Sequence, residues 1–62
     1  AEHGLTKREI DVLERLNKGL ANRDIGVNLS ISTGTVRKHI ENIYRKLQVH
    51  NKMEAVSLTQ KE

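Results

Sequence analysis

The amino-acid sequence predicts an all-α protein, a four-helix bundle. Apolar residues recur at spacings of three and four, which is the period of a helix with one buried face. The chain has no Pro, and Ser, Thr, Asn and Gly residues stand where helices would begin and end. With 62 residues, it is one small domain at most, and its core needs nearly every aliphatic side chain.

The first helix is expected from about residue 7 to residue 18. Thr6 would cap its start, with Glu9 three residues later. This spacing is a capping box, in which each side chain accepts a hydrogen bond from the other residue's backbone N–H. Gly19 would supply the left-handed residue that ends the helix.

A short second helix is expected over residues 22–28, with Asn22 as its cap. The third would run over residues 33–47 after a cap at Ser32. Its apolar residues form one stripe, so one face of this helix should lie on the core. The stripe residues are Val36, Ile40, Ile43 and Leu47.

A last helix, over about residues 51–60 with Asn51 as a possible cap, would close the domain. Residues 5–62 are interpreted as the domain. Residues 1–4 are interpreted as a linker or a cloning remnant.

Glu9 projects from the middle of the apolar arc of the first helix. A buried carboxylate without a partner would cost several kcal/mol, so we expect a structural ion pair with Lys46, at the edge of the stripe of the third helix. A solvent-exposed Glu9 that only completes the capping box is the alternative, and the two interpretations are not exclusive.

The net charge of +3 lies entirely in residues 33–62, where six Lys and Arg residues stand against three Asp and Glu residues. This asymmetry favours a polyanionic partner. The single aromatic residue, Tyr44, gives no stacking platform for single strands or RNA.

Other functions find no support in the sequence. Without Cys there are no disulfides or thiol chemistry, and His3, His39 and His50 lack the spacing of metal ligands. We expect no metal, no cofactor and no enzymatic activity. Since no apolar run approaches a membrane span or signal peptide, a soluble, cytoplasmic protein is expected.

The second and third helices, joined by a four-residue turn over residues 29–32, have the layout of a helix-turn-helix. Gly26 lies where the two helices would approach most closely, and a small residue there lets the backbones meet. The alternative is that Gly26 only weakens its helix, by about 1 kcal/mol relative to Ala.

Six spaced segments stand out together: residues 5–9 (LTKRE), 12–13 (VL), 19–25 (GLANRDI), 35–39 (TVRKH), 42–47 (NIYRKL) and 51–56 (NKMEAV). With these segments, about residues 5–59 resemble the LuxR-type (LuxR/NarL/FixJ/GerE) helix-turn-helix DNA-binding domain.

The resemblance implies the output domain of a bacterial transcription factor. Such domains usually follow an N-terminal receiver or ligand-binding domain, as in the response regulators of two-component systems. The sequence departs from the family pattern at a few positions. Ser30 replaces the usual turn Gly, Gly26 the usual Ala and Lys52 the usual Arg, while Gly34 brings no side chain to the start of the third helix.

Geometry and resemblance together place the third helix in the major groove of double-stranded DNA, with Arg37, Lys38 and Glu41 at base edges. Alternatively, Arg37, Glu41 and Arg45 form a ladder of ion pairs that only solubilises the helix. The residues expected to contact the DNA backbone are Arg23, Thr33, Thr35, His39, Arg45 and Lys46.

The resemblance also places a dimer contact on the last helix, at Met53, Ser57 and Leu58, so we expect a homodimer on DNA. The alternative is that Met53 and Leu58 fill the small core. Two other functions remain open: a helical module that binds a protein partner instead of DNA, and a helix-turn-helix of the sigma-factor type.

Overall fold

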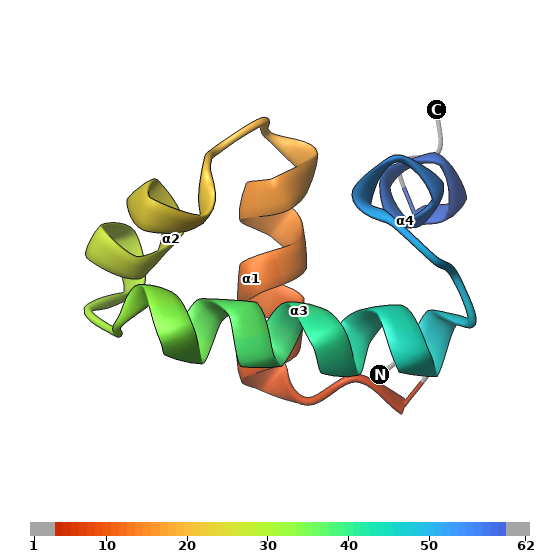
Figure 1. Ribbon diagram of the computed structural model, residues 1–62, viewed down its shortest axis with the longest axis horizontal. Coiled ribbons are helices and arrows are strands. Elements are labelled where there is room, and N and C mark those ends of the chain that lie inside the picture. The colour runs from red at the N-terminus through yellow and green to blue at the C-terminus, as the bar shows by residue number, and fades with distance from the viewer. Residues whose placement is uncertain (1–3, 60–62) are drawn as a thin grey trace.

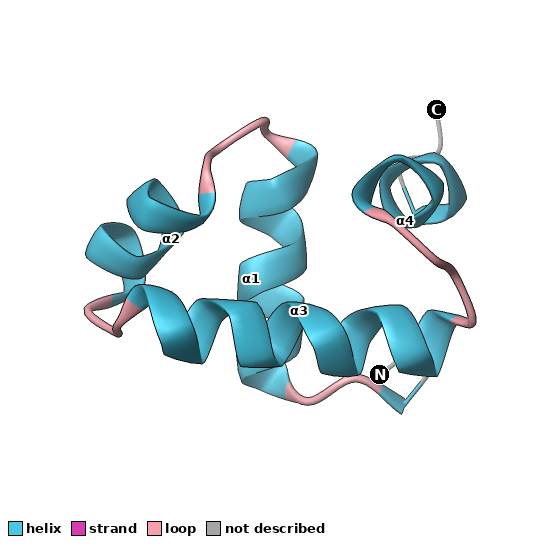
Figure 2. Ribbon diagram, viewed as in Figure 1, coloured by secondary structure: helices cyan, strands magenta, loops and turns pink. Residues whose placement is uncertain are grey.

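The computed structural model describes residues 4–59, which form four α-helices joined by short loops (Figure 2). The all-α, four-helix fold expected from the sequence is confirmed. The helices are α1 (Lys7–Asn17), α2 (Asn22–Leu29), α3 (Thr33–Leu47) and α4 (Lys52–Thr59).

Three of the expected helix ends shift slightly. The bounds of α3 agree with the prediction, whereas α1 ends at Asn17, α2 ends at Leu29 and α4 begins at Lys52. The expected end of the last helix at residue 60 lies outside the described residues, as does the expected linker except for Gly4. No helix within residues 4–59 combines the length and apolar character that crossing a membrane requires.

α3 is the longest helix and organises the domain. It crosses in front of α1, with α2 near its N-terminal end and α4 near its C-terminal end (Figure 1), and it packs against each of the three. Among residues 4–59, no helix covers the side of α3 that faces the viewer in Figure 1. α3 therefore has one face on the core and another free.

The core is built from the apolar stripes that the sequence indicated. Every residue of the α3 stripe is buried, and Val36 and Ile43 are 0% exposed. Tyr44 packs its ring against this core, and burial raises the pKa of its hydroxyl. The buried apolar residues are Leu5, Val12, Leu13, Leu16, Ile25, Val36, Ile40, Ile43, Leu47 and Ala55.

The expected caps of α1 and α3 are present. The Oγ1 atom of Thr6 accepts a hydrogen bond from Glu9 N–H at 3.1 Å, and Glu9 Oε1 accepts one from Thr6 N–H at 2.9 Å. At α3, Ser32 Oγ accepts a hydrogen bond from Thr35 N–H at 3.1 Å. Both helix starts are thus fixed by local side-chain chemistry.

The expected cap of α2 is wrong. Asn22 is the first residue of that helix, and Ala21 is the N-cap without a side-chain hydrogen bond. The helix starts there because Ala21 is extended and its carbonyl accepts a hydrogen bond from Ile25 N–H at 3.0 Å. At α4, Asn51 Oδ1 accepts a hydrogen bond from Glu54 N–H at 2.9 Å, in agreement with a cap at Asn51.

Each of the three loops between the helices begins with or contains a residue in the left-handed conformation. Gly19, with φ of 87°, follows α1 as expected. Ser30 has φ of 61° and Gln48 has φ of 59°, although both carry a Cβ atom that disfavours this conformation. Ser30, which stands where the family usually has a turn Gly, therefore holds a strained conformation, and the left-handed Gln48 was not predicted.

Gly26 allows a close approach within the helix-turn-helix. A Cβ atom at this position would lie 2.7 Å from the carbonyl oxygen of Ile31 and 3.6 Å from the nitrogen of Thr33. The first distance is too short for real contacts, so Gly26 has a packing role. The contact is with the turn that leads into α3.

The ion pair expected between Glu9 and Lys46 is present. Lys46 Nζ lies 2.8 Å from Glu9 Oε1 and donates to the carbonyl oxygen of Gly4 at 3.3 Å. The Glu9 side chain is 5% exposed, so the alternative of a solvent-exposed carboxylate is wrong.

The environment of Glu9 favours its charged form. Burial pushes the pKa of the Glu9 carboxyl up, but the hydrogen bonds from Lys46 and Thr6 and the charge of Lys46 outweigh it, so the pKa is lowered. A carboxyl group whose pKa is lower in the folded state stabilises the fold above its ordinary pKa, and this contribution is lost as the pH falls.

Replacing Ser30 by Gly should stabilise the domain. Gly adopts a positive φ without the Cβ clash, so Ser30→Gly should raise the free energy of unfolding by about 0.5–1 kcal/mol, as measured by urea denaturation. The control Ser30→Ala also removes the hydroxyl but keeps the Cβ atom, and it should bring no gain. An equal gain in both variants would contradict the strain at Ser30.

Removing the ammonium partner of Glu9 should destabilise the domain. Lys46→Met leaves a buried carboxylate unpaired, so we expect a loss of about 2–3 kcal/mol in the free energy of unfolding. The double variant Glu9→Gln/Lys46→Met removes the uncompensated charge and should recover part of this loss.

The pH dependence provides a second measurement of the same pair. The wild-type free energy of unfolding should fall as the pH drops below about 4.3, the ordinary pKa of Glu. Glu9→Gln should lack that part of the decrease. Identical pH profiles, or an unchanged stability of Lys46→Met, would show that the pair does not stabilise the fold.

Candidate nucleic-acid interface

The face of α3 opposite the core is exposed and basic. At 3.6 residues per turn, the residues between the buried stripe positions project away from the core. Arg37, Lys38, Glu41 and Arg45 are all exposed, and the backbone of Gly34 is exposed beside them. The residues expected at base edges thus lie on the free face of α3.

The alternative of an ion-pair ladder along α3 is wrong. Within residues 4–59, no salt bridge joins Glu41 to Arg37 or Arg45. Arg37 and Lys38 likewise make no hydrogen bond to another described side chain. These side chains can therefore engage a ligand without first breaking a contact inside the domain.

At the start of α3, the backbone N–H groups of Thr33 and Gly34 have no hydrogen bond within residues 4–59, and the two threonines Thr33 and Thr35 are exposed. The Oγ1 atom of Thr35 lies 2.9 Å from Ser32 Oγ, which fixes the side chain in the first turn. Backbone N–H groups at the start of a helix favour an anion. This end of α3 is therefore suited to a phosphate.

The other side chains expected to contact the DNA backbone differ in how exposed they are. Arg23 is exposed in the first turn of α2, whereas His39 is half-buried on a flank of α3. Lys46 already donates to Glu9 and Gly4. An ammonium has three donors, so at most one N–H of Lys46 is free for a phosphate while these two contacts last.

Arg45 has a partner that the sequence analysis did not assign. Its Nη2 atom donates to Asn42 Oδ1 at 2.6 Å, and Asn42 is half-buried on the same helix. The only sequence signal for this pair is the spacing of three residues, which places two side chains side by side on a helix. Asn42 thus joins the set of candidate residues.

α4 presents an apolar surface beside the end of α3. Met53 is 79% exposed and Leu58 is 44% exposed, so the alternative in which they fill the core is wrong. Ala55 is buried, whereas Val56 is only half-buried.

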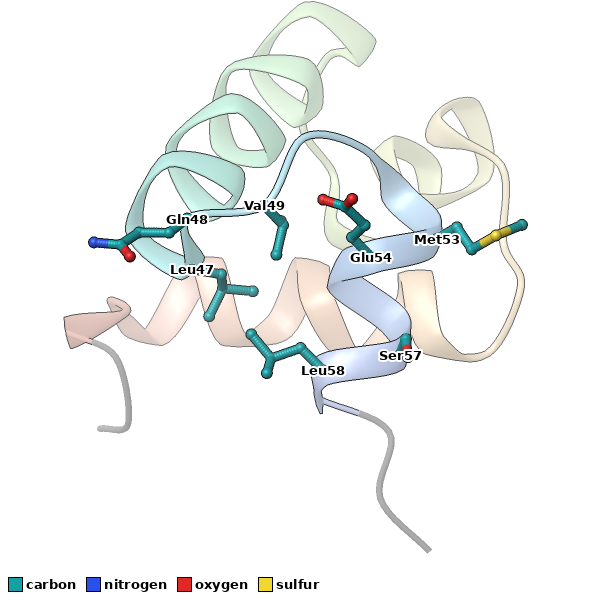
Figure 3. A pocket seen from close by; sticks show the side chains of 7 residues that line it. All are labelled: Leu47, Gln48, Val49, Met53, Glu54, Ser57 and Leu58. Atoms are coloured by element: carbon teal, nitrogen blue, oxygen red, sulfur yellow. The ribbon is translucent and has the colours of Figure 1, made fainter.

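A shallow pocket adjoins this surface (Figure 3). Figure 3 shows Leu58 and Leu47 pointing toward one another across it, while Met53 points in the opposite direction. α4 therefore offers an apolar patch together with a hollow beside it. The pocket is lined by Leu47, Gln48, Val49, Met53, Glu54, Ser57 and Leu58.

Known proteins contain a segment that is similar in sequence to this chain. The family described as bacterial regulatory proteins, luxR family, matches residues 3–59. The nitrate/nitrite response regulator protein NarP of Escherichia coli (strain K12) is 48% identical over 54 residues, which cover 87% of this chain and 25% of NarP. The glycerol metabolism activator of Pseudomonas putida is 46% identical over 52 residues, or 84% of this chain and 24% of that protein.

A third relative, the transcriptional regulatory protein DegU of Brevibacillus brevis, is 44% identical over 54 residues, which cover 87% of this chain and 23% of DegU. The chain spans about a quarter of the length of these relatives. The family match extends over all of the described residues, including the whole helix-turn-helix. The chain therefore belongs to the luxR family of bacterial regulatory proteins, as a helix-turn-helix DNA-binding domain.

Proposed function

We propose that this domain is the output part of a bacterial transcriptional regulator and reads double-stranded DNA with α3 in the major groove. The observation that carries the proposal is the free, basic face of α3, whose exposed side chains at Arg37, Lys38 and Glu41 have no partner among the described residues. The major groove admits an α-helix and displays a distinct pattern of donors and acceptors for each base pair.

Three side chains would read the bases. Arg37 can donate two hydrogen bonds to O6 and N7 of a guanine, and Lys38 can donate to the same acceptors. Glu41 can accept a hydrogen bond from the amino group of a cytosine. These contacts would provide sequence specificity, because base edges differ while phosphates do not.

The phosphate contacts would position the helix. One DNA phosphate would be held by Thr33, Thr35 and the backbone amides at the start of α3. Farther along the helix, Arg45 and His39 would contact the DNA backbone. Arg23 would reach the backbone from α2. Lys46 would contribute through an N–H that Glu9 and Gly4 leave free.

The full-length protein would carry an N-terminal receiver or ligand-binding domain, as its much longer relatives allow. Two copies of the DNA-binding domain would occupy neighbouring half-sites and meet through the apolar patch of α4. Met53, Ser57 and Leu58 would form that contact. Such a regulator would act in the bacterial cytoplasm, where the DNA lies.

Base-reading residues should discriminate between DNA sequences. Duplexes selected by the chain from a random pool serve as the specific ligand, and a random-sequence duplex as the non-specific one. Arg37→Ala or Lys38→Ala should weaken binding mainly to the selected duplex, by about 1–3 kcal/mol, as measured by fluorescence anisotropy.

Arg45→Ala is the matched control, since it also removes one positive charge from α3. It should weaken binding to both duplexes alike and reduce the dependence of log K on log salt by about 1. Equal losses on both duplexes for Arg37→Ala and Lys38→Ala would refute base reading. Wild-type binding that does not weaken with salt would refute the phosphate contacts and favour a module that binds protein.

A charge on the α4 patch should disrupt pairing of two domains on DNA. Met53→Asp should leave affinity for a single half-site unchanged and reduce the cooperativity on two half-sites on the order of tenfold, as measured by gel shift. Val27→Asp places the same charge on another exposed apolar residue, 76% exposed on α2. This control should keep the cooperativity, and an equal loss in both variants would contradict a dimer contact on α4.

A further inference from the structure

The hydrogen bond between Arg45 and Asn42 fixes the direction of the Asn42 amide. The guanidinium of Arg has donors only, so the atom it contacts at 2.6 Å must be the amide oxygen. The NH₂ group of Asn42 then points away from Arg45. Among residues 4–59, no hydrogen bond from this NH₂ group to another residue is found.

The pair consequently presents mainly donors to its surroundings. Arg45 occupies one of the two lone pairs of the Asn42 amide oxygen, while the remaining side-chain N–H groups of both residues have no hydrogen-bond partner within residues 4–59. A phosphate offers only acceptor oxygens, and hydrogen bonds to such an anion are stronger than neutral ones. The chemistry of the pair thus fits a phosphate.

The position of Asn42 on α3 fits the same ligand. By helical periodicity, Asn42 lies between the exposed face, with Lys38 and Arg45, and the flank that carries Thr35 and His39. The DNA backbones border the major groove that α3 would occupy. A side chain at the edge of the base-reading face would therefore meet phosphates.

We propose that Asn42 and Arg45 form one phosphate-binding unit, in which the Asn42 NH₂ group and the Arg45 guanidinium donate to the same stretch of DNA backbone. This inference rests on the proposed function. Because Asn42 holds the long Arg45 side chain in place, less conformational freedom is lost on binding. Lys46, two of whose donors are engaged by Glu9 and Gly4, is less free for this task.

Asn42→Asp tests the proposal. The substitution preserves the shape of the side chain and an oxygen for Arg45, but replaces the donor NH₂ by a charged acceptor. If Asn42 only holds Arg45, a carboxylate holds it at least as well. If Asn42 donates to a phosphate, affinity for both the selected and the random-sequence duplex should fall by about tenfold or more.

The chain offers a matched control. Asn28 Oδ1 accepts a hydrogen bond from Arg15 Nε at 2.7 Å, so Asn28→Asp makes the same chemical change in another Asn–Arg pair, between α2 and α1. Both variants add one negative charge, so the difference between their affinities for DNA reports the effect that is specific to Asn42. In addition, the side-chain NH₂ signal of Asn42 in ¹⁵N NMR spectra should shift when random-sequence duplex is added, while that of Asn28 should not.

Each outcome decides the proposal. Equal affinities of Asn42→Asp and Asn28→Asp, or tighter binding by Asn42→Asp, would overturn it. Should circular dichroism show that Asn42→Asp is unfolded, Asn42→Ala replaces it, with an expected loss of about three- to tenfold on both duplexes, and no loss would overturn the proposal. Failure of the wild-type chain to bind any duplex would overturn the proposed function itself.

Discussion

The ion pair between Glu9 and Lys46 determines how α3 lies on α1. Glu9 belongs to the first turn of α1 and Lys46 to the last turn of α3, and the Glu9 side chain is buried. A buried carboxylate needs its partner, so a rotation of α3 about its axis that moved Lys46 away would be costly. The rotation that satisfies Glu9 also turns the apolar stripe to the core and leaves Arg37 and Lys38 outside.

Much of this fold could be predicted because its determinants are local. The capping box of Thr6 and Glu9 and the cap at Ser32 follow from residue types at fixed spacing. The start of α2 at residue 22 was predicted, but its cap, Ala21, was missed because an extended backbone, which any residue can adopt, defines it. The left-handed Gln48 was missed because its Cβ atom disfavours this conformation, so the residue type gives no sign that α3 ends there.

The candidate site likewise has a part that local sequence predicts and a part that it does not. Helical periodicity alone places Arg37, Lys38 and Glu41 on the exposed face, and the structure has them there. Periodicity gives the side of a helix but not which neighbouring side chains are hydrogen-bonded. The sequence therefore left Arg45 open to a pair with Glu41, whereas its guanidinium is bonded to Asn42. That choice depends on side-chain conformations, which spacing does not specify.

The partners that α3 lacks are as informative as those it has. Glu41 is exposed on a basic face, yet no cation within residues 4–59 forms an ion pair with it. Under the proposed function, this carboxylate would be repelled by phosphates and would be satisfied only by a base that presents an amino group. A protein distinguishes one DNA sequence from another by repelling the wrong bases as well as by attracting the right ones. Donors such as Arg45 and Asn42 would bind any backbone, whereas Glu41 would penalise a wrong base at one position.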